Sequence, residues 1–193
     1  MKKRLLLLCL AVLLTAVPGC AWNQAEKQQD FVPGEVVSTY WFQFTLESAE
    51  EVDSYDGYRA GDGNRLLVCR ISLENTFDDT VSMAQTDFFL LWEDPTSTTA
   101  DTDTGLEGMV GTYALPHFSN RQLEDAYDLD REEMQEGDLV FEIPEEITQC
   151  ALVFEEYYVD AESETGYSVG DHYAVWISLD EEQENENSEM EGN

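Results

Sequence analysis

The sequence predicts an all-β protein, an antiparallel immunoglobulin-like β-sandwich of about seven to nine strands. Two observations lead to this class. Apolar and polar residues alternate with a period of two along several short segments, and turn-forming clusters such as "GDGN", "NTFDD", "EDPTST" and "ESETG" separate them. Apolar residues make up 42% of the chain and aromatic residues 11%, which is enough to build a hydrophobic core.

The alternation is clearest in "RLLVCRISLE", where Leu67, Cys69 and Ile71 face one way and Arg70 and Ser72 the other. The full set of expected strands is "YWFQFTLES", "RLLVCRISLE", "TVSM", "DFFLLW", "GTYAL", "DLVFEIP", "QCALVFEEYY" and "HYAVWISL".

One short helix is expected in a crossover between strands, in the segment "SNRQLEDAYDLD". It opens with Ser119, and Gln122 follows three residues later, as in a capping box. Leu123, Ala126 and Tyr127 then fall on one helical face.

The N-terminus has the layout of a secretory signal. Three basic residues precede an apolar run of about 13 residues, shorter than the ~20 that span a bilayer. Val17-Pro18-Gly19-Cys20 resembles a bacterial lipobox, in which the cysteine receives a diacylglycerol and the chain is cut just before it. The resemblance implies a protein anchored in the cell membrane through Cys20 and facing the extracytoplasmic side. In the alternative, Cys20 is incidental to an ordinary cleavage site.

The chain is expected to divide into four parts. Residues 1–19 are a lipoprotein signal peptide, and residues 20–33 are the lipidated cysteine with a flexible tether. Residues 34–179 form the sandwich. Residues 180–193, with seven acidic residues and no basic one, form a disordered tail.

The net charge is −33, and removal of residues 1–19 would make it three units more negative. Nucleic acid is excluded as a partner because no basic stripe is present to neutralise phosphates. Anionic lipid headgroups would also repel the chain, so the lipid on Cys20 must hold it at the membrane. Such a field favours cations and basic proteins, although high charge also serves solubility alone.

Three segments resemble a bacterial family of secreted or lipid-anchored immunoglobulin-like domains of unknown function, related to the immunoprotective extracellular antigens. They are "GDGNRLLVCRISLENTFDDTVSM", "DFFLLWED" and "EGDLVFEIPEEITQCALVFEE", and the likeness runs from about Val36 to Glu155. The family has a strand that ends in Asn, here Asn75, then a Phe-x-Leu strand, here Phe88 to Leu90. The resemblance implies the sandwich fold and no catalytic residue. An Asn at that position is expected to form the turn.

Cys69 and Cys150 fall on inward faces of two expected strands, about 80 residues apart. Such strands in opposite sheets of a sandwich can be bridged, and a disulfide is permitted outside the membrane. The alternative is a pair of buried free thiols that pack as small hydrophobes.

The loop of residues 94–107 suggests a second function, a calcium-responsive binding module. Asp101 and Asp103 place hard oxygen ligands at alternate positions, and Glu107 could complete a site. The glutamate that closes an EF-hand loop is absent, and solvated loops share this composition. No other cofactor is expected.

An enzyme of the cell envelope is the third and least favoured reading. The chain has two histidines, His117 and His172, without the spacing of a zinc site, and no nucleophile elbow or phosphate-binding loop. The first hypothesis is therefore a non-enzymatic binding module whose partner is an envelope protein or glycan. Aromatic residues that could contact a sugar or protein, or simply pack on the sheets, are Trp41, Tyr157, Tyr158 and Trp176.

Substitution of Cys20 by Ala should move the protein from the membrane fraction to the soluble extracytoplasmic fraction, because the lipid is the expected anchor. Immunoblotting of the two fractions measures this. A Cys20→Ala protein that stays with the membrane would contradict the lipobox interpretation.

Overall fold

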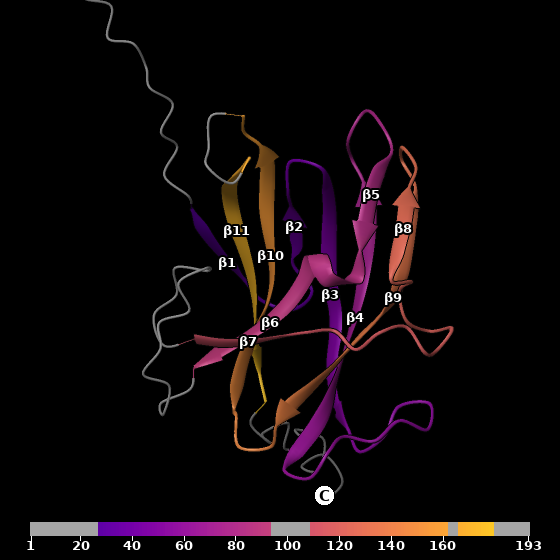
Figure 1. The fold of residues 1–193 in the computed structure, drawn as a ribbon, viewed down its shortest axis with the longest axis vertical. Coiled ribbons are helices and arrows are strands. Elements are labelled where there is room, and N and C mark those ends of the chain that lie inside the picture. The colour runs from indigo at the N-terminus through magenta and orange to yellow at the C-terminus, as the bar shows by residue number, and fades with distance from the viewer. Residues whose placement is uncertain (1–26, 94–108, 162–165, 180–193) are drawn as a thin grey trace, which may run out of the picture.

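The computed structural model describes residues 27–93, 109–161 and 166–179, and within these ranges the chain is almost wholly β (Figure 1). The described residues contain no α-helix, and so none with the length and apolar character needed to span a bilayer. The elements are β1 (Gln28–Phe31), β2 (Val36–Ser38), β3 (Phe42–Val52), β4 (Asn64–Asn75), β5 (Val81–Ala84), the 3₁₀ turn η1 (Gln85–Asp87), β6 (Phe88–Glu93), β7 (Met109–Tyr113), β8 (Ala126–Leu129), β9 (Met134–Pro144), β10 (Gln149–Val159) and β11 (Tyr167–Ser178).

Two sheets and a separate two-stranded ribbon make up the fold, as Figure 1 shows. One sheet has the strand order β1-β11-β10-β6-β7, the other has the order β2-β3-β4-β9, and β5 pairs only with β8. Every pairing is antiparallel except that of β1 with β11. The antiparallel β-sandwich predicted from the sequence is confirmed.

The core lies between the two sheets and is built from the faces that the alternation predicted. Phe42 and Phe44 of β3 meet Phe88 of β6 and Phe154 of β10, with ring centroids 4.8 Å apart for Phe42 and Phe154 and 5.2 Å apart for Phe44 and Phe88. These four rings are at most 6% exposed, so they hold the facing sheets together by apolar burial. Each expected strand overlaps a strand of the structure.

The helix expected from Ser119 is wrong. One half of the capping box forms, since the Ser119 amide donates to Gln122 Oε1 at 3.1 Å, but the chain then leaves the turn. The Leu123 amide donates to the Asp138 carbonyl, and the Asp138 amide donates to the Arg121 carbonyl. Pairing with β9 therefore takes the backbone groups that a helix would have used, and Ala126–Leu129 continues as β8.

Part of the expected tether is also ordered. Gln28–Phe31, within the range 20–33, forms β1 and runs parallel to β11 from His172 to Val175. Phe31 packs partly against the core and stacks on Tyr173 at 6.5 Å. The sandwich thus begins before residue 34, because an edge strand needs little alternation of its own when its neighbour supplies the hydrogen bonds.

Cys69 in β4 and Cys150 in β10 lie in the same core cluster, on facing sheets, and both are free thiols in the structure. The two side chains pack as buried apolar groups in the structure, and the disulfide stays a prediction. Burial raises the pKa of both thiols, that of Cys150 to about 12. Both are consequently protonated and unreactive at neutral pH.

Asn75 ends β4 and forms the turn, as expected, and it also reaches further. Its Oδ1 accepts from the Phe77 amide at 2.8 Å, while its Nδ2 donates to the carbonyls of Asp79 and Leu129 at 2.9 and 2.8 Å. Asn75 is 1% exposed. One buried amide thus closes the turn after β4 and ties it to the end of β8.

Asn75→Asp tests the two roles separately, because Asp can accept the Phe77 amide but places an oxygen opposite two carbonyls. We expect Asn75→Asp to lower the free energy of unfolding by about 2–3 kcal/mol, at least as much as Asn75→Ala. Chemical denaturation measures this. If Asp substituted without loss, Asn75 would serve only the turn.

Candidate functional site

A pocket of about 330 Å³ opens between β10 and the β5–β8 ribbon. In Figure 1, β10 and the β5–β8 ribbon lie in the upper part of the molecule, and β6 is labelled below them. The core rings of Phe42 and Phe154 form part of its lining. The other lining residues are Trp41, Phe77, Thr80, Val81, Ser82, Met83, Asp87, Glu155 and Tyr157.

Aromatic side chains gather at the rim beside the turn between β2 and β3. Trp41 contacts three rings, with centroid distances of 4.6 Å to Tyr40, 5.0 Å to Phe77 and 6.0 Å to Tyr158. Tyr40 is 58% exposed. We call these four residues the aromatic rim. Edge and tilted contacts of this kind are favourable for aromatic rings and leave ring surface available to a ligand.

The turn that carries Tyr40 and Trp41 is closed by one side chain. Thr39 Oγ1 accepts from the amides of Trp41 and Phe42 at 3.2 and 3.1 Å and donates to the Phe42 carbonyl at 2.7 Å. A threonine at this place satisfies backbone groups that the strand ladder leaves open. Tyr40 and Trp41 are thereby held outside the core, next to the pocket.

Glu156 of β10 is 4% exposed, and its carboxylate has three donors. Oε1 accepts from the Tyr40 amide at 2.7 Å and from the Tyr173 hydroxyl at 2.9 Å, and Oε2 accepts from the Tyr158 hydroxyl. Burial, followed by the hydrogen bond to Glu156, raises the pKa of both tyrosines. A carboxylate with several donors can be buried at tolerable cost, so Glu156 joins the rim to both sheets.

An irregularity in the β10–β11 pairing makes room for Glu156. The register shifts between Glu155 and Tyr157, so that Glu156 lies opposite two residues of β11. One of the two is Gly170, where an added Cβ would lie 2.4 Å from Tyr158 Cε2. Glycine is therefore required by the close approach of the Tyr158 ring.

Two carboxylates line the pocket, and their surroundings differ. Burial pushes the pKa of Glu155 up, but hydrogen bonds from His172 and Tyr157 outweigh it, and the pKa stays below its ordinary value. His172 Nδ1 lies 3.0 Å from Oε1, and the Tyr157 hydroxyl donates to Oε2 at 2.6 Å. Glu155 is therefore charged at neutral pH.

Asp87 is half-buried at the end of η1. Burial raises its pKa from 3.8, against the lowering effect of the hydrogen bond that the Ala84 amide donates to Oδ2 at 2.8 Å. No other donor of the described residues reaches this carboxylate. Asp87 thus offers the pocket an acceptor oxygen, and the burial of its carboxylate disfavours the charged form.

The hydroxyl donors of the lining are already engaged. Thr80 Oγ1 donates to Asp130 Oδ1 at 3.0 Å, and Ser82 Oγ donates to Asp128 Oδ1 at 2.7 Å. The Tyr157 hydroxyl is used by Glu155. Among the described residues, no lysine or arginine lines the pocket. The pocket consequently offers a ligand aromatic faces and carboxylate oxygens.

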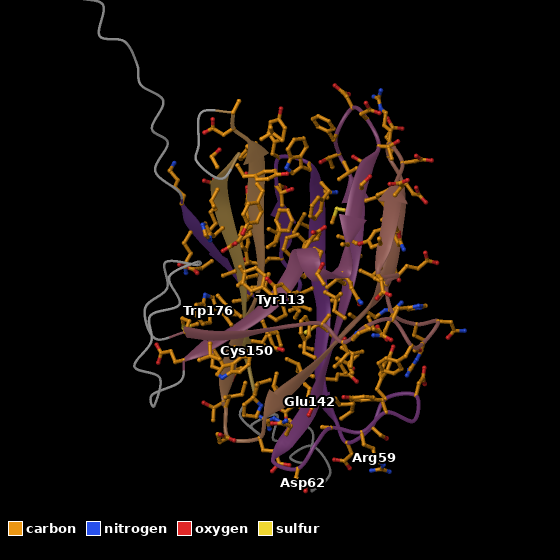
Figure 2. All side chains as sticks on the ribbon, in the orientation of Figure 1. Arg59, Asp62, Tyr113, Glu142, Cys150 and Trp176 are labelled. Carbon is orange, nitrogen blue, oxygen red and sulfur yellow. The ribbon has the colours of Figure 1, made fainter. Side chains whose placement is uncertain are left out.

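The aromatic residues noted in the sequence take two different places. Trp41 and Tyr157 line the pocket, and Tyr158 belongs to the aromatic rim. Trp176, labelled in Figure 2, lies apart on β11, where its Nε1 donates to Asp30 Oδ1 of β1 at 2.8 Å. It borders a second cavity of about 60 Å³ beside Leu91 and Val153. Trp176 therefore covers the sheet edge, as sheet packing predicts.

Cys20 and the calcium residues Asp101, Asp103 and Glu107 lie outside the described residues. Within the described ranges, no group of three or more potential ligand side chains is placed to hold a metal ion. His117 lies in a loop, where its amide donates to Asp125 Oδ1 at 2.8 Å. The calcium hypothesis stays a prediction.

No family model matches the chain, and no curated protein is similar to it. Several solved structures, among them the following three, are similar at low identity. The candidate lipoprotein ycdA of Bacillus subtilis shares 15% identity with a TM-score of 0.49, over 74% of this chain and 38% of that protein. The chain thus spans well under two thirds of ycdA. The yjhA protein of Bacillus subtilis shares 18% identity with a TM-score of 0.47, over 74% of this chain and 99% of that one. An uncharacterised β-sandwich protein of Clostridium difficile shares 12% identity with a TM-score of 0.40, over 79% of this chain and 96% of that one.

Asp87→Asn tests whether the charged carboxylate of Asp87 lowers the thermal stability of the protein. Because the folded state raises the pKa of Asp87, it holds the proton more tightly than the unfolded state, and stability is lost as pH rises from about 3.8 through the folded pKa. Asn keeps an oxygen for the Ala84 amide and carries no charge. We expect the Asp87→Asn variant and the wild type to melt alike below pH 3.8 and the variant to melt higher at pH 7. A lower melting temperature of the variant at pH 7 would contradict this account.

Proposed function

We propose that this chain is a lipid-anchored, extracytoplasmic bacterial lipoprotein whose β-sandwich is a non-enzymatic ligand-binding module of the cell envelope. The pocket between β10 and the β5–β8 ribbon is the observation that carries the proposal. Its volume of about 330 Å³ lies at the lower end of the range typical of small-molecule sites, and apolar walls with a few placed polar groups are characteristic of such sites.

The architecture around the pocket supports binding rather than catalysis. Its two carboxylates are held by His172, Tyr157 and the Ala84 amide, and its lining includes no serine or cysteine paired with a histidine. The lipobox-like segment at Cys20 supports attachment to the outer face of the membrane. A ligand there can be a free small molecule or a group presented by an envelope protein or glycan.

A fragment screen by ligand-observed NMR on the full chain in neutral detergent tests the binding function. The library should hold cationic, neutral and anionic members in equal number. We expect hits that compete for one site and disappear in Ser82→Phe, which places a large ring at the lining of the pocket. Ser54→Phe, the same substitution at an exposed loop position, is the control and should keep the hits. No hits, or hits that survive Ser82→Phe, would overturn the proposed function.

A further inference from the structure

We propose that the pocket is selective for an organic cation, an alkylammonium group that enters between the aromatic walls and meets Asp87 and Glu155. This inference rests on the proposed function and names the chemical class of the ligand. A free quaternary amine and the side chain of a lysine share that chemistry.

The walls supply the first part of the argument. Trp41, Phe77 and Tyr157 line the pocket, and Phe42 and Phe154 lie beneath them. The face of an aromatic ring carries negative charge density, which attracts a cation within about 6 Å of the ring centre, and tryptophan does so most strongly. Trp41 is fixed by its contacts to Tyr40 and Phe77, so its ring is placed before any ligand arrives.

The hydrogen-bond inventory supplies the second part. A neutral sugar or an anion needs donors from the protein, but the hydroxyls of Thr80, Ser82 and Tyr157 already donate to carboxylates of the protein itself. The charged carboxylates of Asp87 and Glu155 can only accept, and each already accepts at least one hydrogen bond from the protein. An ammonium group brings donors or positive charge and no acceptor, and so it complements the two carboxylates of the lining.

The electrostatic surroundings supply the third part. The chain carries a net charge of −33, and the hydroxyls of Ser82 and Thr80 are hydrogen-bonded to the carboxylates of Asp128 and Asp130. A concave, partly apolar site concentrates such a field on a bound cation. A metal ion is a poorer match than an organic cation, because it requires several oxygen ligands and the described residues hold no group of three potential ligand side chains.

Isothermal titration of the full chain in neutral detergent, at constant ionic strength, tests the inference with matched probes. Choline and 3,3-dimethylbutan-1-ol have nearly the same shape, and only choline is charged. We expect choline to bind about tenfold or more tightly than the alcohol. n-Butylammonium, which mimics a lysine side chain, distinguishes the sources: tighter binding of n-butylammonium points to a lysine of a partner protein, and tighter binding of choline points to a free quaternary amine.

Two variants connect the affinity to the pocket. Asp87→Asn and Trp41→Leu should each weaken binding of the preferred cation about tenfold, by loss of charge and of the ring face. Asp62→Asn removes the same charge at the opposite end of the molecule in Figure 2 and should leave the affinity unchanged.

The outcomes separate the two proposals. Equal affinity for choline and the alcohol, or hits from the fragment screen that are mainly neutral or anionic, would overturn cation selectivity and leave a binding pocket. Equal loss of affinity in Asp62→Asn and Asp87→Asn would show a general charge effect and overturn the assignment to this pocket. A screen without hits would overturn the binding function itself.

Discussion

The buried carboxylate of Glu156 is the interaction on which the open end of the sandwich depends. It accepts from the backbone of Tyr40, in the turn between two strands of one sheet, and from the hydroxyls of Tyr158 and Tyr173 in the other sheet. A carboxylate with fewer donors at 4% exposure would be strongly unfavourable, so each of these contacts stabilises the buried charge. The irregular pairing of β10 and β11, the glycine at position 170 and the exposed turn at Tyr40 all follow from this requirement.

The pocket exists because a second polar contact holds the opposite wall. The β5–β8 ribbon belongs to neither sheet, and no ladder of backbone hydrogen bonds fixes its distance from β10. Asn75 supplies a connection, since its amide joins the end of β4 to the carbonyls of Asp79 and Leu129 on either side of the ribbon. Glu156 positions one wall and Asn75 the other. The space between them is lined partly by core side chains such as Phe42 and Phe154.

The alternation of apolar and polar residues was enough to predict the sandwich and its core. In long strands such as β3 and β4 one face is buried, so every second residue is apolar. The alternation failed where pairing came from a neighbour rather than from the segment's own pattern. β1 takes its order from β11, and Ser119–Leu123 shows a helix-like start that contact with β9 overrides. The local preference of a segment for a helix is weaker than the backbone hydrogen bonds that it gains by pairing with a neighbouring strand.

Only part of the candidate site could be predicted from the sequence, for a related reason. Trp41 and Tyr157 were among the four aromatic residues that the sequence offered for contact with a sugar or protein or for packing on the sheets. Asp87 and Glu155 were not predicted, because the chain has 42 acidic residues and no spacing distinguishes two of them. What sets them apart is their surroundings, the burial of one and the hydrogen bonds of the other, and these exist only once β10 and η1 are brought together.

The abundance of acidic residues also explains how such a pocket can select its ligand. Asp128 and Asp130 accept hydrogen bonds from the hydroxyls of Ser82 and Thr80, and Glu155 accepts one from Tyr157, so none of these three hydroxyls has a hydrogen left to donate to a ligand. A ligand that brings only acceptors would bury the Asp87 carboxylate further without giving it a donor, at a cost of about 1–3 kcal/mol for an unpaired polar group. Selectivity for a cation would then come as much from the rejection of neutral and anionic ligands as from attraction to the rings.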